Sequence, residues 1–206
     1  MPTRNRLIVA TVLLTTTALA GTANFDDARP GAAPDGWMAT QTGRGTAQWS
    51  VVSDATAPSP PNVLKQSGVA AYPVCLKNDT RLQAGFVEVK FKAVSGTDDQ
   101  AAGLVWRAQV ADNYYLARAN AREDNVCLYC MMQGKRTEKK RVERKIASGE
   151  WHTLRVDFRE NHFTITVNGS TILEWDDSTF PAAGMVGVWT KADSVTLFDD
   201  FSYGGK

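Results

Sequence analysis

The segment from Asp112 to Asn125, DNYYLARANAREDN, places aromatic, basic and amide side chains together in a stretch that otherwise alternates like a strand. If residues 113–121 form a strand, Tyr114, Arg118 and Asn120 share one of its faces. Tyrosine rings pack on the CH faces of sugars, and arginine and asparagine bond to hydroxyl groups. This face therefore suits carbohydrate recognition. The alternative is an ordinary amphipathic strand whose arginine pairs with an acid.

Two neighbouring strand candidates extend this face. In residues 101–109 the alternation puts Arg107 on the same side as Arg118, and in residues 125–132 it brings Tyr129 close by. Small alanines on the opposite side of residues 113–121 fit a packed sheet, so the polar face is expected to look toward solvent. The predicted binding residues are Arg107, Tyr114, Arg118, Asn120 and Tyr129.

Period-2 alternation runs through most of the chain. It is clearest in FVEVKFKAV and WHTLRVDF, and Asn168-Gly169 between two alternating runs is a strong hairpin signal. No long stretch has the 3.6-residue period of a helix. The remaining strand candidates are residues 46–53, 70–76, 101–109, 113–121, 125–132, 184–190 and 194–203. About a dozen short antiparallel strands in one domain, residues 21–206, predict an all-β fold: a two-sheet antiparallel β-sandwich of the jelly-roll kind.

The first twenty residues have the composition of a secretory signal peptide. Arg4 and Arg6 precede the apolar run LIVATVLLTTTALA, which ends on small residues, so cleavage is expected after Ala20. The run is too short to span a membrane. The protein is therefore predicted to be exported to the periplasm or the extracellular space, with no membrane span in the mature chain.

The charge of the chain gives no case for a nucleic-acid partner. The formal charge is +1, and loss of the two leader arginines makes it −1. The basic segment KRTEKKRVERK, residues 135–145, is interrupted by Glu138 and Glu143 and predicts a solvated hairpin rather than an anion-binding patch. The three cysteines, Cys75, Cys127 and Cys130, are interpreted as small buried residues, although export would permit one bridge from Cys75.

Several blocks resemble a known family. GLVWRAQVADNYYLARANAREDNVCLY, SGEWHTLRVDF, VNGSTILEWDDSTF and GMVGVWTKADS resemble exported bacterial domains of the concanavalin A-like lectin/glucanase (LamG-type) group, and most closely the 3-keto-disaccharide hydrolase-like domains. The likeness covers residues 24–203. It implies a jelly roll for the fold and an association with carbohydrate for the function, because such folds host lectins, hydrolases and adhesion modules.

The paired carboxylates of the glucanases in this group are incomplete here. In EWDDST, Glu174 and Asp176 fit the glucanase spacing, but Thr179 stands where the last acid should be, so the segment is interpreted as the end of a strand. A 3-keto glycoside can instead be cleaved by elimination and hydration, because the ketone acidifies the neighbouring C–H bond. Candidates for its acid and base are His152, Asp112, Glu123, Asp124 and Asp193, although His152 is better explained as a core or edge residue than as a base.

Carboxylates near the two ends of the domain suggest a structural calcium ion. NFDD supplies Asp26 and Asp27, and LFDD supplies Asp199 and Asp200. First and last strands usually lie together in this fold, and carboxylate oxygens are calcium ligands. The alternative is a pair of capped strand ends. In the turn before the last strand, Lys191 and Asp193 are expected to pair at the rim.

Three functions remain open. The first is an exported domain that binds a glycan on an open sheet face. The second is a glycoside hydrolase or lyase of the 3-keto-disaccharide type. The third is a non-catalytic adhesion or structural module. The missing carboxylate pair ranks binding above catalysis.

Overall fold

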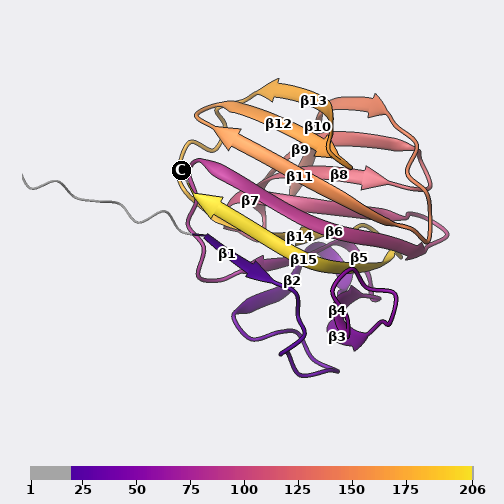
Figure 1. The fold of residues 1–206 in the computed structure, drawn as a ribbon. Coiled ribbons are helices and arrows are strands. Elements are labelled where there is room, and N and C mark those ends of the chain that lie inside the picture. Colours follow the sequence, from indigo (N-terminus) through magenta and orange to yellow (C-terminus); the bar gives the residue numbers. More distant parts are fainter. Residues whose placement is uncertain (1–19, 206) are drawn as a thin grey trace, which may run out of the picture.

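The computed structural model describes residues 20–205 as two antiparallel sheets packed face to face (Figure 1). The first sheet, sheet A, has the order β13-β12-β11-β6-β15-β4-β3, and β1 pairs with β15. Its strands are β1 (Ala20–Ala23), β3 (Trp49–Ser53), β4 (Asn62–Gln66), β6 (Gly85–Ser95), β11 (Trp151–Arg159), β12 (His162–Val167), β13 (Ser170–Asp176) and β15 (Val195–Gly205).

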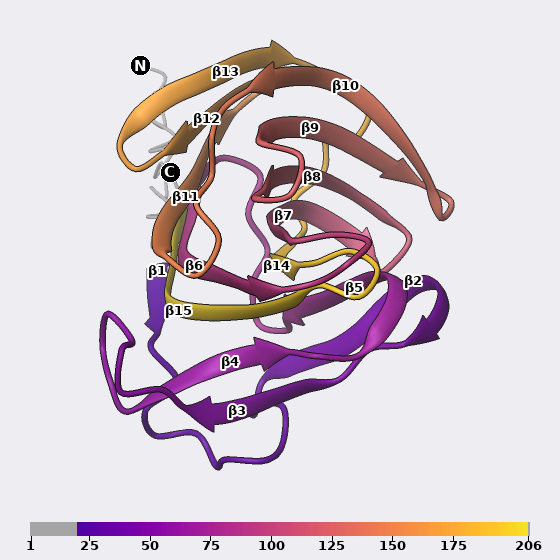
Figure 2. The ribbon, with the colours of Figure 1, turned by 90° about the vertical axis from the view of Figure 1, so that its right-hand side faces the viewer.

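The second sheet, sheet B, has the order β10-β9-β8-β7-β14-β5-β2. Its strands are β2 (Trp37–Thr46), β5 (Val69–Lys77), β7 (Ala101–Val110), β8 (Asn113–Asn120), β9 (Asn125–Met132), β10 (Lys135–Glu143) and β14 (Met185–Trp189). Figure 2 shows the two sheets as nested curved layers whose edge strands β13 and β10 approach each other. The predicted two-sheet sandwich is confirmed.

The alternation seen in the sequence builds the core between the sheets. Val87, Val89 and Phe91 of β6 face inward and are fully buried, while the charged residues between them stay at the outer surface. Trp106 of β7, on sheet B, packs against side chains of sheet A in this core. Its ring centroid lies 5.2 Å from that of Phe163 on β12. The core therefore follows from period-2 patterning on both sheets.

The hairpin between β12 and β13 forms where Asn168-Gly169 predicts it. Both residues have positive φ, 50° and 75°, as a tight two-residue hairpin turn requires. Strand β13 ends at Asp176, so EWDDST is the end of a strand, as predicted, and Glu174 is exposed there. The basic segment at residues 135–145 contributes the edge strand β10 of the β9–β10 hairpin.

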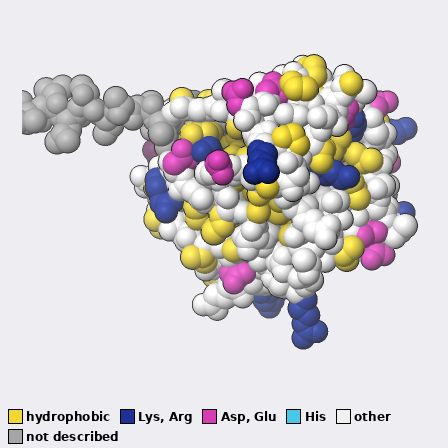
Figure 3. Space-filling model, turned by 90° about the horizontal axis from the view of Figure 1, so that it is seen from below, with side chains coloured by type: hydrophobic (Ala, Val, Ile, Leu, Met, Phe, Trp, Pro, Cys, Tyr) yellow, Lys and Arg dark blue, Asp and Glu magenta, His cyan; other side chains and the backbone are white. Residues whose placement is uncertain are grey.

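The predicted signal peptide lies outside the described residues except for Ala20, which pairs with Gly204 at the start of β1. Within residues 20–205, no helix is long and apolar enough to cross a membrane. Figure 3 shows basic and acidic side chains interspersed over one face of the molecule, without a large area of a single sign. This mixture agrees with the nearly neutral formal charge of the chain.

All three cysteines are buried and free, as the simplest interpretation of the sequence predicted. Cys75 and Cys130 lie in the core between the sheets, whereas Cys127 lies on the outer face of sheet B. Burial raises the pKa of the Cys75 thiol. These thiols pack as small apolar side chains.

Candidate functional site on the concave face of sheet B

The outer face of sheet B is concave. Strands β10 and β5 are separated by β9, β8, β7 and β14, which corresponds to about 24 Å in a flat sheet. Yet the guanidinium carbon of Arg136 on β10 lies 5.0 Å from the ring centre of Tyr72 on β5. The sheet must curl strongly for these side chains to meet, and we call this outer surface the concave face.

The predicted alternation of β8 is correct, but its predicted exposure is wrong. Tyr114 and Leu116 lie on the concave face, and Ala117 packs in the core between the sheets. Tyr114 and Asn120 are fully buried and Arg118 is 1% exposed, although solvent exposure was expected. Side chains from neighbouring elements cover this strand: the Tyr114 hydroxyl contacts Thr42 of β2 and Trp189 of β14.

Arg107 does not lie on the concave face, so its predicted position beside Arg118 is wrong. The pairing of β7 with β8 shifts register after Trp106, and Arg107 adopts a positive φ of 49° at this bulge. Its guanidinium instead donates hydrogen bonds to three loop carbonyls and lies 5.6 Å from the ring centre of Phe163. Those carbonyls belong to Gln83, Glu160 and Phe180. Burial lowers the pKa of Arg107.

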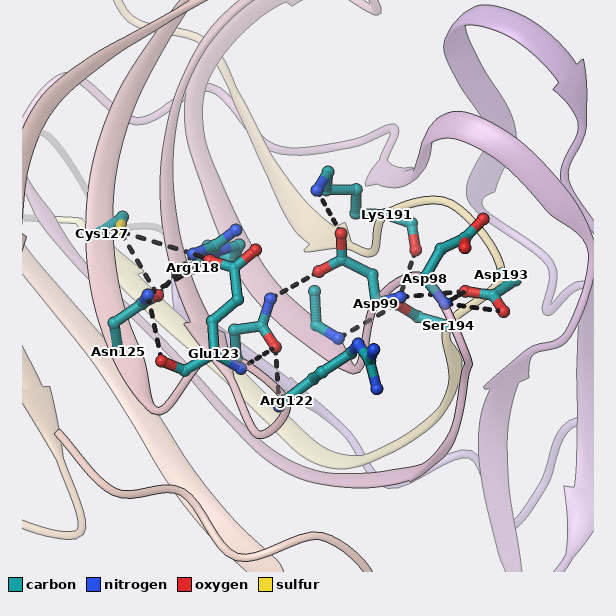
Figure 4. A network of polar contacts seen from close by, with 12 residues as sticks. Asp98, Asp99, Arg118, Arg122, Glu123, Asn125, Cys127, Lys191, Asp193 and Ser194 are labelled. Carbon is teal, nitrogen blue, oxygen red and sulfur yellow. Dashed lines mark hydrogen bonds and ion pairs between the residues drawn. The ribbon is translucent and has the colours of Figure 1, made fainter. Parts of the chain in front are cut away.

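Arg118 anchors a polar network at one end of the concave face (Figure 4). Its Nη2 donates to a carboxylate oxygen of Glu123 at 2.8 Å and to the side-chain oxygen of Asn125. Its guanidinium carbon lies 5.5 Å from the ring centre of Tyr129. The Nε of Arg118 is buried and has no hydrogen-bond partner among residues 20–205. The network holds Glu123 with its carboxylate at the rim, one third exposed.

A second part of the network holds Lys191 at the same rim. Asp99, 1% exposed, accepts a hydrogen bond from Asn120 and forms an ion pair with the partly exposed Lys191. Asp193 accepts from the backbone N–H groups of Thr97, Asp98 and Asp99. The predicted pairing of Lys191 with Asp193 is therefore wrong, because Asp193 caps this loop and Lys191 turns to Asp99.

The other part of the concave face is an aromatic cluster, which we define as Tyr72, Tyr129 and Trp189 with the guanidinium of Arg136. Tyr72 and Trp189 are stacked with ring centres 5.8 Å apart. The indole N–H of Trp189 donates to the hydroxyl oxygen of Tyr114 at 3.2 Å. Burial, partly offset by hydrogen bonds, raises the pKa of Tyr114 to about 12. Tyr72 is half-buried.

The histidine and two of the acids predicted for catalysis have structural partners. His152 is 8% exposed, and its ring nitrogens lie 2.9 Å from the Ala147 carbonyl oxygen and 3.1 Å from the side-chain nitrogen of Asn168. Asp124 accepts a hydrogen bond from the backbone N–H of Ile146. Burial acts to raise the pKa of Asp193, but its backbone hydrogen bonds lower it to about 2, which makes it a weak base.

Glu123 and Asp112 are the remaining catalytic candidates. Burial acts to raise the pKa of Glu123, but the hydrogen bond and charge of Arg118 lower it to about 2. A carboxylate with such a pKa suits hydrogen bonding to hydroxyl groups better than proton abstraction near neutral pH. Asp112 is exposed in the turn between β7 and β8, close enough to Tyr114 for its charge to raise the pKa of that phenol.

The Glu123–Arg118 pair predicts a measurable loss of stability in acid. The folded pKa of Glu123, about 2, lies below the unfolded value of about 4.3. The pair therefore contributes stability above that unfolded pKa, and the contribution is lost as pH falls toward 2. We expect urea unfolding from pH 5 to pH 2 to show a shallower pH dependence in Glu123→Gln than in the wild type. Glu150→Gln, at an exposed glutamate, is the control, and an unchanged slope in Glu123→Gln would contradict the prediction.

Three of the four aspartates predicted to bind calcium have protein partners. Asp26 accepts from the backbone N–H of Asn62, and Asp199 accepts from the backbone and side chain of Ser59. Asp200 pairs with Lys90 at 2.8 Å, and Asp27 is exposed. Within residues 20–205, no three His, Cys, Asp or Glu side chains gather in a group able to hold a metal ion. The carboxylates thus do not form one ready ligand set, and calcium binding stays a prediction.

Sequence reasoning missed several residues of the concave face. Arg136 was assigned to a solvated segment, but it lies on β10 opposite Met131 of β9, on the concave face. Asp99 and Lys191 lie in segments far apart in the sequence, so no local spacing connects them. The other residues that were missed are Tyr72, Asn125, Arg141 and Trp189.

Comparisons with known proteins agree with the fold and name a family. Residues 22–200 match the model of the family described as 3-keto-alpha-glucoside-1,2-lyase-like domains. No curated protein sequence matches the chain significantly.

Solved structures with similar folds include proteins whose descriptions name carbohydrates. The carbohydrate-binding module CBM66 of Bacillus subtilis has 17% identity and a TM-score of 0.66, with 84% of this chain and 97% of that chain covered. A Bacteroides ovatus mixed-linkage-glucan GH16 protein, solved with a G4G4G3G product, has 10% identity, a TM-score of 0.62 and coverage of 89% and 99%. A Bacillus licheniformis β-glucanase has 12% identity, a TM-score of 0.55 and coverage of 91% and 98%. At such low identity these likenesses show the fold alone.

Proposed function

Because the chain belongs to the family of 3-keto-alpha-glucoside-1,2-lyase-like domains, we propose that it recognises a carbohydrate on the concave face of sheet B. The protein is proposed to do so after export, as its N-terminal sequence predicts. One observation carries the proposal: the rim of the concave face presents an aromatic ring, a carboxylate and cations that are partly exposed and held by buried partners.

Each rim group has a fixed position. Tyr72 stacks on Trp189. Glu123 is held by Arg118, and Lys191 is held by Asp99. Groups that are already ordered lose little conformational entropy when a ligand binds. A sugar ring can stack on Tyr72 while its hydroxyl groups bond to the carboxylate and the ammonium group.

We expect Tyr72→Ala to weaken carbohydrate binding at least about tenfold, which corresponds to about 1.4 kcal/mol. The measurement is titration calorimetry of the purified protein, after a thermal-shift screen of disaccharides and oligosaccharides has identified a ligand. Phe86→Ala is the matched control, because Phe86 is also a half-buried aromatic that contacts an arginine, on the outer face of sheet A. Equal losses in both variants, or a folded protein that binds no carbohydrate, would reject the proposal.

The family match also supports a second function, elimination from a 3-keto glycoside. A base would take the proton from C2, the C2–H electrons would form an enolate with the C3 ketone, and its collapse would break the C1–O bond. The departing oxygen would take up a proton, and water could then add to the unsaturated sugar. Asp112 is the candidate base, since it is an exposed carboxylate beside Tyr114 at the concave face.

This second function requires turnover. Incubation with 3-keto disaccharides, read by mass spectrometry, should give the released sugar and an unsaturated keto sugar. The mass of this keto sugar should be one water less than that of the free 3-keto monosaccharide. Asp112→Asn should abolish the formation of both products. Glu174→Gln, at an exposed acid on β13, should be as active as the wild type. Binding without any product from a folded protein would leave carbohydrate recognition as the function.

A further inference from the structure

Most cations on the concave face are paired with acids. Arg118 pairs with Glu123 and Lys191 pairs with Asp99. Arg141 on β10 pairs with Glu138 at 2.8 Å. Arg136 is different, because it forms no ion pair with any residue between 20 and 205.

Aromatic rings hold the guanidinium of Arg136 in place. Its guanidinium carbon lies 4.4 Å from the ring centre of Tyr129, 5.0 Å from that of Tyr72 and 5.8 Å from that of Trp189. Cation–π attraction favours this position. The side chain is partly exposed, and its Nη1 is buried without a hydrogen-bond partner among the described residues. Arg136 is thus a fixed positive charge with hydrogen-bonding capacity left over.

An arginine on the opposite side of the molecule shows that stacking does not exclude an acid partner. Arg155 on sheet A lies 4.1 Å from the ring centre of Phe86, closer than Arg136 lies to any of its rings. Arg155 nevertheless bonds to Asp157 at 2.6 and 2.7 Å and reaches Glu88 at 3.4 Å. Stacking on aromatic rings therefore does not explain why Arg136 forms no ion pair among residues 20–205.

We propose that the carbohydrate bound on the concave face is acidic and that Arg136 binds its carboxylate or sulfate group. This inference rests on the proposed carbohydrate binding and names its ligand class. A guanidinium offers a planar fork of N–H donors that matches the oxygen atoms of either oxyanion. The aromatic surroundings reduce the screening of the charge, so an anion placed there gains more than it would at an open surface. The sugar ring that carries the anion can lie against Tyr72.

The test compares ligands that differ only in this charge. Disaccharides ending in glucose, in glucuronic acid or in a sulfated glucose are titrated into the protein at low and high salt. We expect at least one acidic ligand to bind about tenfold more tightly than the neutral one, with the difference shrinking as salt rises. The two acidic arms distinguish a carboxylate from a sulfate.

Variants connect the preference to the residue. Arg136→Gln should remove the preference, so that the affinities for the acidic and the neutral disaccharides lie within about twofold of each other. Arg136→Lys keeps the charge without the fork and should retain part of the preference. Arg155→Gln is the matched control and should leave it unchanged. If Arg136→Gln does not fold, the Lys variant decides, because full retention of the preference would contradict recognition by the fork.

The outcomes separate this inference from the function on which it rests. Equal affinity for neutral and acidic ligands overturns the acidic preference and leaves carbohydrate binding intact. A folded protein that binds none of these ligands, and nothing in the wider screen, rejects both. If the preference for acidic ligands persists in Arg136→Gln, the anion binds at another residue, and the assignment of anion binding to Arg136 is wrong.

Discussion

Replacing Arg107 with alanine is expected to lower the free energy of unfolding by about 3–5 kcal/mol, the range seen when one side of a buried charged network is removed. The guanidinium donates to three backbone carbonyls, those of Gln83, Glu160 and Phe180. These carbonyls belong to three loop segments that are far apart in the sequence and converge on Arg107. Its loss would leave them without their donor and leave a gap beside the core phenylalanines. The midpoint of thermal unfolding should fall by about 10 °C.

Denaturant unfolding and calorimetry measure this effect. Arg159→Ala is the control, since Arg159 is an exposed arginine at the end of β11 and should change the unfolding energy by less than about 0.5 kcal/mol. Arg107→Lys keeps the charge but cannot reach all three carbonyls, so an intermediate loss is expected. A loss below about 1 kcal/mol in Arg107→Ala would show that the carbonyl bonds contribute little to stability.

Arg107 and Arg118 show why only part of the site could be predicted from the sequence. Both arginines stand in alternating strands, in LVWRAQV and YLARANA, and the pattern treats them alike. The bulge after Trp106 turns Arg107 away, whereas β8 pairs with β9 without interruption and keeps Arg118 on the concave face. A bulge depends on pairing with strands distant in the sequence, so alternation alone does not reveal it.

The curvature of sheet B is the second feature that the sequence did not reveal. Alternation assigned Tyr114 to the correct face, but whether that face is open depends on twist accumulated over seven strands. The contact between Arg136 and Tyr72 is a direct consequence of this curvature. It joins strands at nearly opposite edges of the sheet, and no local pattern connects them.

The fold was easier to predict than the site because it depends on short-range patterns. Val87, Val89 and Phe91 mark β6 through their alternation alone, and Asn168-Gly169 marks the turn after β12. Strand β2 was not predicted, because its second half, TQTGRGT, has no apolar alternation and two glycines. It becomes a strand by pairing with the more apolar β5. Tertiary pairing thus overrides weak local propensity.

Arg118 is the most informative residue of the proposed binding surface, because its replacement should change both the stability of the protein and its affinity for carbohydrate. Arg118→Met would leave the Glu123 carboxylate without its main partner, and we expect a loss of about 1–3 kcal/mol in unfolding energy, because Glu123 is partly solvated. Carbohydrate affinity should fall at least about tenfold, since the carboxylate would no longer be fixed at the rim. Arg118 then acts as a positioning residue, and Glu123 is the group that touches the ligand.

A double-mutant cycle distinguishes this positioning from general loss of structure. If Arg118 acts through Glu123, then Arg118→Met, Glu123→Gln and the double variant should lose similar amounts of affinity, because each removes the same oriented carboxylate. Their unfolding energies should differ, with the double variant more stable than Arg118→Met alone, since no unpaired charge remains. Additive losses of affinity would instead mean that Arg118 contributes to binding independently of the Glu123 carboxylate. The cycle thus decides whether the arginine acts through the carboxylate.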